Sequence, residues 1–400
     1  MLILVINSGS SSLKFQLIDS EKKQMLVKGL CERIGIEEPF FDYENGGCSI
    51  HEPRQMDTHK DAVHILLETL LDPECGVIGS LDEIAAVGHR VVHGGPHFSH
   101  PALVTEETKE AILKSSGWCP LHNQANLTGI EVLEKAMPGV PQVAVFDTAF
   151  HQTMPPEAYM YGIPYEYFEK FDMRRYGFHG TSHEFVTRRA AEMTKHDPAS
   201  FRLITCHLGN GSFFAAIKGG RCLDTSMGLT PLEGIMMGTR CGSIDPAIPP
   251  FIGKLGNCTP DEVDDILNKK SGMLGISGVS MDFRDIQAAA AEGNERARLA
   301  VKMFCYQAIK IIGSYIAALG GLDTLVFTAG VGENDEMIRK SICDGLAYSG
   351  IEIDQERNLI RRKEAILSTE DSAVEVFVIP TNEELSIAVQ TAEVLKKTDA

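Results

Sequence analysis

The chain has 400 residues, of which 44% are hydrophobic and 23% are charged, and its formal net charge is −18. At roughly 150 residues per domain, this length predicts two or three domains with sizeable cores. The acidic balance argues against a protein that binds nucleic acid, because affinity for a phosphate backbone comes mainly from Lys and Arg. A protein of this charge that acts on an anion must concentrate positive charge locally.

The ten cysteines are widely spaced along the chain. They are too sparse for a disulfide framework, and they contain no C-x-x-C pair for a zinc or redox site. This spacing predicts a reducing compartment. The apolar run at residues 2–6 is too short for a signal peptide or a membrane span. We therefore expect a cytoplasmic protein that binds neither membranes nor nucleic acid.

The predicted strands begin with two copies of one design. Residues 2–6 form a buried strand, a turn-rich break follows, and residues 13–18 alternate as a second strand. The same strand, small-residue loop and strand return at 203–208 and 213–217, followed by another short strand. Two copies about two hundred residues apart indicate a duplicated architecture.

Further strands are predicted at 142–146 and 324–328, and the latter runs into a glycine-rich turn at 329–334. The predicted helices are 60–71, 105–116, 182–195, 260–269, 285–291, 295–319, 336–346 and 385–397. The last helix has a start signal, because Thr381 and Glu384 have the spacing of a capping box. That assignment explains Glu384 and leaves Glu383 without a structural duty. The boundary between the two halves is expected near residue 150.

The loop from Asn7 to Lys14 combines backbone N–H groups, hydroxyls and one lysine. Such a loop suits phosphate oxygens, because Gly9 lets the backbone approach the ligand. The alternative is an ordinary polar hairpin turn. The loop at 209–212 is weaker alone, because Asn-Gly is a common hairpin turn. Together, in matched contexts, the two loops favour phosphate binding.

Two arginines are interpreted as loop residues beside glycines, Arg90 before Gly94-Gly95 and Arg240 between Gly238 and Gly242. They could clamp a carboxylate or phosphoryl group through two parallel hydrogen bonds each. Surface ion pairs are the alternative. The nearby spacing of His89, His93 and His97 is typical of a zinc site on a helix. Glycine and proline at 94–96 argue against that helix.

Asp147 follows the predicted strand 142–146, a position suited to catalysis or Mg²⁺ binding, although a helix N-cap is equally common there. His179 lies between glycines in the segment Arg174–His183 and is a candidate electrophile. His183 is interpreted as a structural residue in the first turn of a helix.

The motifs together resemble those of the acetokinase family, within the acetate and sugar kinase/Hsp70/actin superfamily. The resemblance runs from VINSGSSSLKF at 5–15 to PTNEE at 380–384. Between them lie HRVVHGG, VFDTAFHQTMP, RRYGFHGTSH, CHLGNGS, DTSMGLTPLEG, GTRCGSIDPAI and FTAGVGEN.

This resemblance implies an α/β fold of two ribonuclease H-like domains, each a βββαβαβα core, with an active-site cleft between them. The domains would be 1–149 plus 384–400, and 150–383, and the assembly a homodimer. It implies reversible, Mg²⁺-dependent transfer of the ATP γ-phosphoryl group to acetate, giving acetyl phosphate and ADP, with Mn²⁺ able to substitute for Mg²⁺. Direct in-line transfer is expected. Propionate kinase and a non-catalytic nucleotide-binding regulator are the alternatives.

The resemblance also implies roles for particular residues. The catalytic set would be Asn7, Arg90, Asp147, His179 and Arg240, and the metal set Asn7, Asp147 and Glu383. Acetate would contact Arg90, Val92, Leu121, Phe178 and Pro231. ATP would contact Ser10, Ser12, Lys14, His207, Asn210, Gly211, Asp282, Phe283, Arg284, Gly330, Val331, Gly332 and Asn334. A branched Val92 predicts a preference for acetate, with propionate a poorer substrate by about 1–3 kcal/mol. Phe213 departs from the family pattern beside the second phosphate loop.

Overall fold

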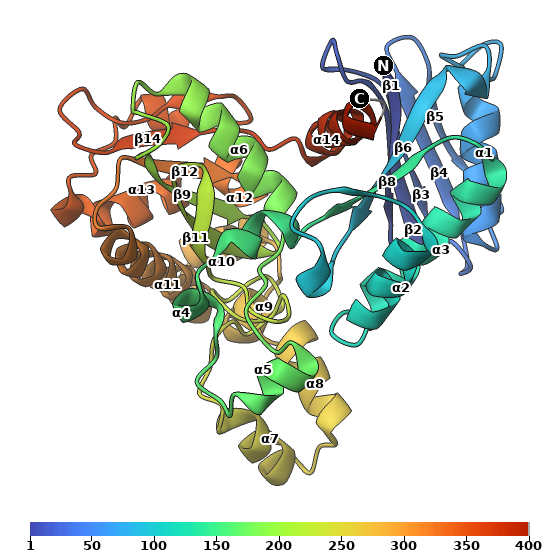
Figure 1. The fold of residues 1–400 in the computed structure, drawn as a ribbon. Coiled ribbons are helices and arrows are strands. Elements are labelled where there is room, and N and C mark those ends of the chain that lie inside the picture. The colour runs from blue at the N-terminus through green and yellow to red at the C-terminus, as the bar shows by residue number, and fades with distance from the viewer. Residues whose placement is uncertain (399–400) are drawn as a thin grey trace. The chain divides into compact units, whose positions relative to one another are not determined.

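The computed structural model describes residues 1–398, without the side chains of Pro120 and Leu121. The chain forms two compact units, drawn in Figure 1. Unit 1 comprises Met1–Gln152, Phe178–Thr181 and the C-terminal segment from Asn382. Unit 2 comprises Thr153–Gly177 and Ser182–Thr381.

Unit 1 is built on an eight-stranded sheet in the order β5-β4-β3-β2-β1-β6-β8-β7. The strands are β1 (Leu2–Ser8), β2 (Ser12–Asp19), β3 (Gln24–Glu32), β4 (Phe40–Asn45), β5 (Ser49–Pro53), β6 (Ile84–Val91), β7 (Ala102–Leu103) and β8 (Gln142–Phe146). Strands β1 to β5 are antiparallel neighbours, whereas β6 and β8 run parallel to β1. The parallel strands therefore end at one common edge.

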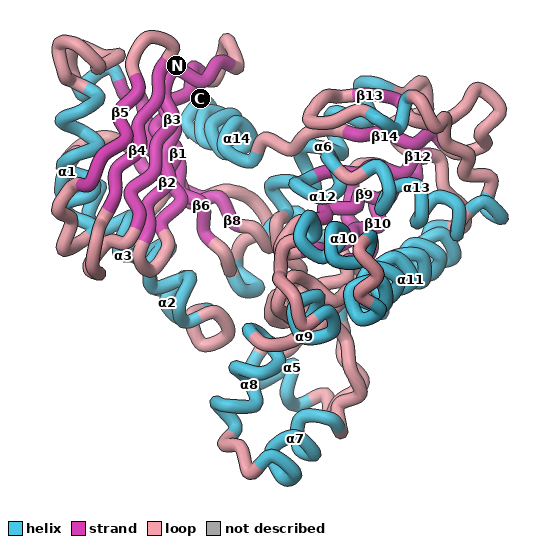
Figure 2. Tube along the Cα trace, turned by 180° about the vertical axis from the view of Figure 1, so that it is seen from behind, coloured by secondary structure: helices cyan, strands magenta, loops and turns pink. Residues whose placement is uncertain are grey.

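Helices cover both faces of this sheet (Figure 2). They are α1 (His59–Leu70), α2 (Glu106–Ser115), α3 (Pro120–Ala136) and α14 (Glu383–Thr398). Alternate residues of β1 explain the two layers: Leu4 and Ile6 join the core beneath α1 and α3, whereas Ile3 and Val5 pack against α14. Helix α14 approaches closely at Gly88, where a Cβ would lie 2.4 Å from Thr391 Oγ1.

Unit 2 is built on a six-stranded sheet in the order β11-β10-β9-β12-β14-β13. Its strands are β9 (Arg202–Leu208), β10 (Ser212–Lys218), β11 (Arg221–Thr225), β12 (Thr324–Thr328), β13 (Ala365–Ile366) and β14 (Glu375–Val378). The first three are antiparallel, and β12 and β14 run parallel to β9.

The two sheets share one topology. In each, three antiparallel strands, β1–β3 in unit 1 and β9–β11 in unit 2, are followed by two parallel strands on the far side of the first, with a short antiparallel strand closing that edge, and unit 1 adds β4 and β5 beside β3. Strands β1, β6 and β8 of unit 1 thus correspond to β9, β12 and β14 of unit 2. This correspondence confirms the duplicated α/β architecture predicted from the two strand–loop–strand copies.

The helices of unit 2 include the apolar α11, which packs in the core of that unit through Phe304, Ala308 and Ile312. Among the described residues, α11 alone is long and apolar enough to span a membrane by length and composition. Its contacts are those of a core helix in a folded domain. The helices of unit 2 are α4 (Pro156–Tyr159), α5 (Glu166–Phe171), α6 (Gly180–Met193, whose first two residues belong to unit 1), α7 (Ile248–Gly256), α8 (Pro260–Lys269), α9 (Gly272–Ser277), α10 (Phe283–Ala291), α11 (Glu295–Leu319), α12 (Ala329–Asn334) and α13 (Glu336–Gly345).

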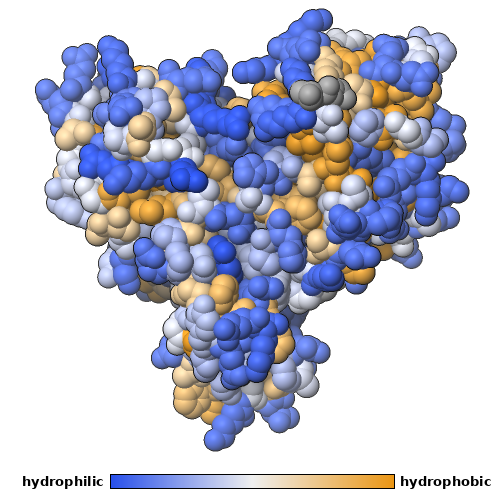
Figure 3. Space-filling model, viewed as in Figure 1, coloured by the Kyte–Doolittle hydropathy of each residue, from blue (hydrophilic) through white to orange (hydrophobic). Residues whose placement is uncertain are grey.

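Helices α5 and α7 carry exposed apolar side chains, which include those of Phe171, Phe251 and Leu255. Leu255 is 83% exposed. In the space-filling view, orange atoms mark apolar surface over this part of unit 2, at the bottom of Figure 3.

The predicted N-cap residue of the last helix is wrong. Asn382 rather than Thr381 caps α14, because its side chain accepts a hydrogen bond from Leu385 N at 3.0 Å. Thr381 instead bonds Ser182 through its hydroxyl and Glu333 through its N–H. The capping box therefore does not form, and Glu384 is not explained by it.

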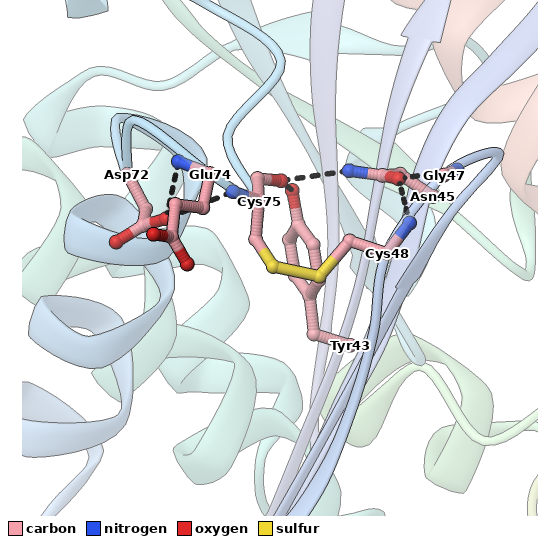
Figure 4. The surroundings of a disulfide bond; sticks show 7 residues. All are labelled: Tyr43, Asn45, Gly47, Cys48, Asp72, Glu74 and Cys75. Carbon is pink, nitrogen blue, oxygen red and sulfur yellow. Dashed lines mark hydrogen bonds between the residues drawn. A yellow bond between two sulfur atoms is a disulfide. The ribbon is translucent and has the colours of Figure 1, made fainter.

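One disulfide joins Cys48 to Cys75, contrary to the expectation of a fully reduced chain (Figure 4). It connects the β4–β5 turn to the loop after α1, with the Cα atoms 5.4 Å apart. Tyr43 Oη and Asn45 Nδ2 both donate to Cys75 O at 2.7 Å. These two hydrogen bonds hold the two segments together. The bridge was not predicted, because two cysteines 27 residues apart form no recognisable sequence motif. The other eight cysteines are free thiols.

Candidate active site

The carboxyl ends of β1, β6 and β8 meet at one edge of the unit 1 sheet and carry Asn7, Arg90 and Asp147. Ligands in α/β proteins bind at this kind of edge. Arg90 lies inside β6, paired with Val145, rather than in a loop after it. Asp147 follows β8 directly and donates its N–H to Val91 O at 2.9 Å. Both side chains are therefore fixed by the sheet.

Arg90 and Asp147 form a two-point ion pair. Arg90 Nη2 lies 2.6 Å from Asp147 Oδ2, and Arg90 Nε lies 3.1 Å from Oδ1. Glu383 Oε2, at the start of α14, is 3.9 Å from the same Nε. Burial alone would lower the pKa of Arg90, but the two carboxylates outweigh it and raise that pKa above its ordinary value. The guanidinium is therefore charged at any working pH.

His179 belongs to a short segment of unit 1 that is held against Asp147. Gly180 N donates to Asp147 O at 2.7 Å, and His151 Nε2 bonds Phe178 O at 2.9 Å. His179 has φ 48°, a left-handed conformation that favours glycine. Its Nδ1 lies 3.5 Å from Glu383 Oε1. Glu383, which sequence patterns left without a role, thus faces both a guanidinium and an imidazole.

The predicted metal set has the chemistry that Mg²⁺ prefers. Asn7, Asp147 and Glu383 offer amide and carboxylate oxygens, and all three belong to unit 1. Arg90 engages both oxygens of Asp147 at 3.1 and 2.6 Å, whereas the contacts of Glu383 with Arg90 and His179 are longer, at 3.9 and 3.5 Å. The residues therefore fit a hard divalent cation, with Glu383 the less committed carboxylate.

The loop between β1 and β2 is a tight turn, in which Gly9 N donates to Ser12 O at 2.7 Å. Asn7 and Lys14 are cross-strand partners at its base. Ser10 and Lys14 are exposed, and Ser12 is half-buried. The turn therefore presents its lysine and hydroxyls to solvent, where phosphate oxygens could reach them.

Two members of the predicted acetate pocket, Val92 and Phe178, are buried in unit 1. Val92 N donates to Asn126 Oδ1 at 3.1 Å, and the Phe178 ring meets His93 edge-on. Leu121 lies in α3, but its side chain is outside the described residues. Pro231 belongs to unit 2, where its carbonyl accepts from Arg240 Nη1 at 3.1 Å. Arg240 is half-buried.

The zinc alternative finds no support among the described residues. His89 is buried within β6 and bonds Gln142 Oε1 at 2.6 Å. Burial lowers the pKa of His89 to about 4. His97 lies in a short 3₁₀ turn at Gly95–His97, so the three histidines do not share a helix. His89 and the buried His183, which bonds Thr205, have the structural surroundings expected of core histidines.

The equivalent edge of unit 2 carries glycine-rich backbone. Gly209-Asn210-Gly211 follows β9, and Ala329–Asn334 follows β12 as the short helix α12. A cavity of about 760 Å³ lies beside them, within the usual range for small-molecule sites. Its lining includes the predicted nucleotide residues Asn210, Asp282, Phe283, Arg284, Gly330, Val331 and Asn334. Gly211 and Gly332 lie in the same two turns but do not line this cavity.

His207 and Phe213 are cross-strand partners below the second loop. The Ser182 hydroxyl bonds His207 Nδ1 at 2.8 Å, and the fully buried Phe213 packs against the rings of His183 and His207. The departure at Phe213 therefore fills the core beneath the loop.

Two cavity residues that the sequence patterns missed are Arg361 and Arg362. They lie in an irregular segment that no glycine motif or helix period marks. A run of three basic residues at 361–363 was the only available signal.

Comparisons with known proteins agree with this geometry. Residues 2–389 match the acetokinase family model. The chain is 56% identical over 397 residues to the acetate kinase of Treponema denticola, covering 99% of this chain and 100% of that protein. The structure of Porphyromonas gingivalis acetate kinase superposes with a TM-score of 0.95 at 45% identity, covering 98% of this chain and 99% of that one. A propionate kinase from Francisella tularensis superposes with a TM-score of 0.91 at 41% identity, covering 97% and 98%. The chain therefore belongs to the acetokinase family.

Proposed function

We propose that this protein is an acetate kinase, which transfers the γ-phosphoryl group of ATP reversibly to acetate. The observation that carries the proposal is the Arg90–Asp147 pair, held at a sheet edge beside Glu383 and His179. A permanently charged guanidinium in partly buried surroundings suits an anionic acceptor. Arg90 also supplies the local positive charge that a protein with a net charge of −18 needs in order to bind an anion.

Arg90 contacts Asp147 through Nε and Nη2, and its Nη1 makes no hydrogen bond within the described residues. That group is available for the acetate carboxylate. Acetate is already ionised at neutral pH, so no general base is required. Asp147 therefore positions Arg90 and helps to organise the metal. Arg240, whose Nη1 donates to Pro231 O at 3.1 Å in unit 2, is assigned to the carboxylate or to the transferring group.

The remaining roles follow the chemistry of phosphoryl transfer, which depends on positioning and on positive charge at the equatorial oxygens. His179 and Lys14 stabilise the transferring group. The turns at 209–211 and 330–334, with Asp282–Arg284, hold the nucleotide. Asn7, Asp147 and Glu383 would hold Mg²⁺, which would supply positive charge to the phosphate oxygens. We further propose that Mn²⁺ substitutes for it.

Transfer is direct and in line, without a phospho-enzyme. An ATP whose γ-phosphorus is chiral tests this step. Inversion at phosphorus is expected, and net retention would contradict direct transfer.

Acetate is the preferred acceptor, because Val92 and Phe178, which we assign to the methyl pocket, are bulky and buried. One extra methylene changes selectivity by only about 1–3 kcal/mol. Propionate is thus a poorer substrate by about 5–150-fold. A kcat/KM for propionate above that for acetate would favour the propionate kinase alternative.

The protein is cytoplasmic and acts as a homodimer. The exposed apolar side chains on α5 and α7 offer a surface that association would cover. Sedimentation of the purified chain tests the dimer. The Cys48–Cys75 bridge is uncommon in a reducing compartment, so its redox state in cells tests the location.

The decisive assay incubates the protein with acetate and MgATP and traps acetyl phosphate as the hydroxamate. Product formation is expected, and its absence would favour a non-catalytic nucleotide-binding regulator. Replacing ATP with pyrophosphate should abolish turnover. Arg240→Ala should lower kcat/KM for acetate about 10²–10³-fold. Near-normal activity in that variant would remove Arg240 from the site.

A further inference from the structure

The lining of the nucleotide cavity of unit 2 includes Arg361 and Arg362. These residues belong to the segment before β13, far in sequence from the glycine-rich turns. The same lining includes Gly209, Asn210 and Gly330. Two arginines and the backbone turns at the carboxyl ends of β9 and β12 thus line one cavity.

The segment that carries them is tied to one of these turns by Arg339. This side chain is fully buried. Its Nη1 donates to Gly332 O in α12 at 2.9 Å, and its Nη2 donates to Ile360 O at 3.0 Å. Its Nε donates to Asn358 Oδ1 at 2.8 Å. The guanidinium therefore links α12 to the residue that directly precedes Arg361.

Arg339 reaches this position at a cost. Its hydrogen bonds are to carbonyl and amide oxygens, and no carboxylate lies within ion-pair distance among the described residues. Burial disfavours the charged form of the guanidinium and lowers the pKa of Arg339. A buried guanidinium is retained only where its hydrogen bonds are nearly complete, which makes the link between the two segments rigid.

The three cavity arginines differ in their partners. Arg284 is paired with Asp282 at 2.5 Å, and Arg361 with Glu336 at 3.1 Å. Arg362 makes no hydrogen bond or ion pair within residues 1–398, and it acts electrostatically on Glu333. It also has φ 51°, a left-handed conformation that is strained for a non-glycine residue. Arg362 is therefore a cavity-lining cation that has a strained backbone and no hydrogen-bond or ion-pair partner among the described residues.

We propose that Arg362 binds the phosphate chain of the nucleotide, and that Arg339 is a positioning residue that holds Arg362 against the glycine-rich turn. This inference rests on the proposed nucleotide site and adds residues to it. The phosphates, rather than adenosine, are the chemical partner, because Arg362 is a cation without a hydrogen-bond or ion-pair partner among the described residues, and the cavity that it lines includes Gly330 in the turn after β12. That turn ends at the same sheet edge as the phosphate loop at 209–211.

Calorimetry of ADP and adenosine binding tests the assignment without requiring turnover. Arg362→Gln should weaken ADP binding about tenfold, the value of one charge-assisted hydrogen bond, and leave adenosine binding within about twofold. Arg362→Gly, which removes the backbone strain with the charge, should give the same pattern in a folded protein. Lys363→Gln, one position along and outside the cavity lining, is the matched control and should bind ADP normally.

Arg339→Lys tests the positioning role. It should raise the KM for ATP about as much as Arg362→Gln while kcat and the KM for acetate stay near normal. The double variant should be no worse than either single one. Unchanged ADP affinity in Arg362→Gln, or an equal loss for adenosine and ADP, would overturn the phosphate assignment. Additive losses in the double variant would overturn the positioning role. Neither result depends on whether acetate is the acceptor.

Discussion

The two sheet edges have the same topology and different chemistry. In unit 1 the carboxyl ends of the parallel strands carry ionisable side chains, the buried Arg90–Asp147 pair above all. In unit 2 the equivalent ends carry glycine-rich backbone, and the charged side chains belong to the lining of a cavity. The same topology therefore positions ionisable side chains for catalysis in unit 1 and glycine-rich turns for nucleotide binding in unit 2.

The cross-strand pairs at the base of the two loops show the difference most simply. Asn7 faces Lys14 in unit 1, and His207 faces Phe213 at the corresponding position of unit 2. The exposed Lys14 can reach a ligand, whereas the buried Phe213 supports the loop from below. The duplicated position is polar where chemistry is proposed and apolar where backbone atoms do the binding.

The largest expected effect comes from the charge at the unit 1 edge. Arg90→Ala should lower kcat/KM for acetate by about 10²–10³-fold, because a donor aimed at the substrate is lost. Removing it also leaves Asp147 as an uncompensated buried charge, which costs about 3–5 kcal/mol of stability. The hydroxamate assay measures the first effect and urea unfolding the second. Near-normal turnover in a folded variant would show that this edge is not catalytic.

The disulfide gives a second contrast, since only unit 1 contains one among the described residues. Closing a loop of this length stabilises a protein by about 3–4 kcal/mol. Cys48→Ser with Cys75→Ser should lower the stability of unit 1 by that amount and leave kcat unchanged. Trp118, the only tryptophan, belongs to unit 1 and reports its unfolding. A reductant should erase the difference between variant and wild type. If it has no effect on wild type, the bridge does not form.

Acid should weaken unit 1 through its buried histidines. Burial lowers the pKa of His89 and of His151 to about 4, below the value of about 6.5 in an unfolded chain. The neutral forms therefore stabilise the fold fully above pH 6.5, and this stability is lost as the pH falls towards 4. Between pH 7 and pH 5 each should cost about 2 kcal/mol. Urea unfolding followed by Trp118 fluorescence measures it, and a flat profile would show that neither histidine is buried neutral.

A smaller effect is expected where α14 meets the sheet. Gly88→Ala would place a methyl group 2.4 Å from Thr391 Oγ1 and 2.9 Å from Ile387 Cγ2. Overpacking of this kind costs about 1–3 kcal/mol. Gly46→Ala, with open space around it, is the control and should be neutral. Equal thermal unfolding of the two variants would mean that α14 does not lie against β6.

Sequence patterns predicted much of this arrangement, because local signals coincide with the core. The strands at 2–6, 142–146 and 324–328 are continuous apolar runs and are buried as predicted. The placement of Asp147 at a strand end followed from the same reasoning. The antiparallel strands β3 to β5 were missed, since their polar faces interrupt the apolar pattern.

What could not be predicted depends on contacts between distant residues. Thr381 has the spacing of a cap but bonds Ser182 and Glu333, so Asn382 caps the helix instead. Arg90 was assigned to a loop because Arg inside a strand is unexpected without a buried partner such as Asp147. Arg339 carried no signal at all, because its acceptors are carbonyl oxygens brought together only by the fold.

The most direct test of the division between the two edges compares Arg90→Gln with Asn210→Ala in two assays, acetyl phosphate formation and calorimetric binding of ADP. We expect Arg90→Gln to lose turnover while its affinity for ADP changes less than about threefold, or 0.7 kcal/mol. Asn210→Ala should instead weaken ADP binding. If Arg90→Gln weakened ADP binding as strongly as Asn210→Ala, the separation of catalysis from nucleotide binding would be contradicted.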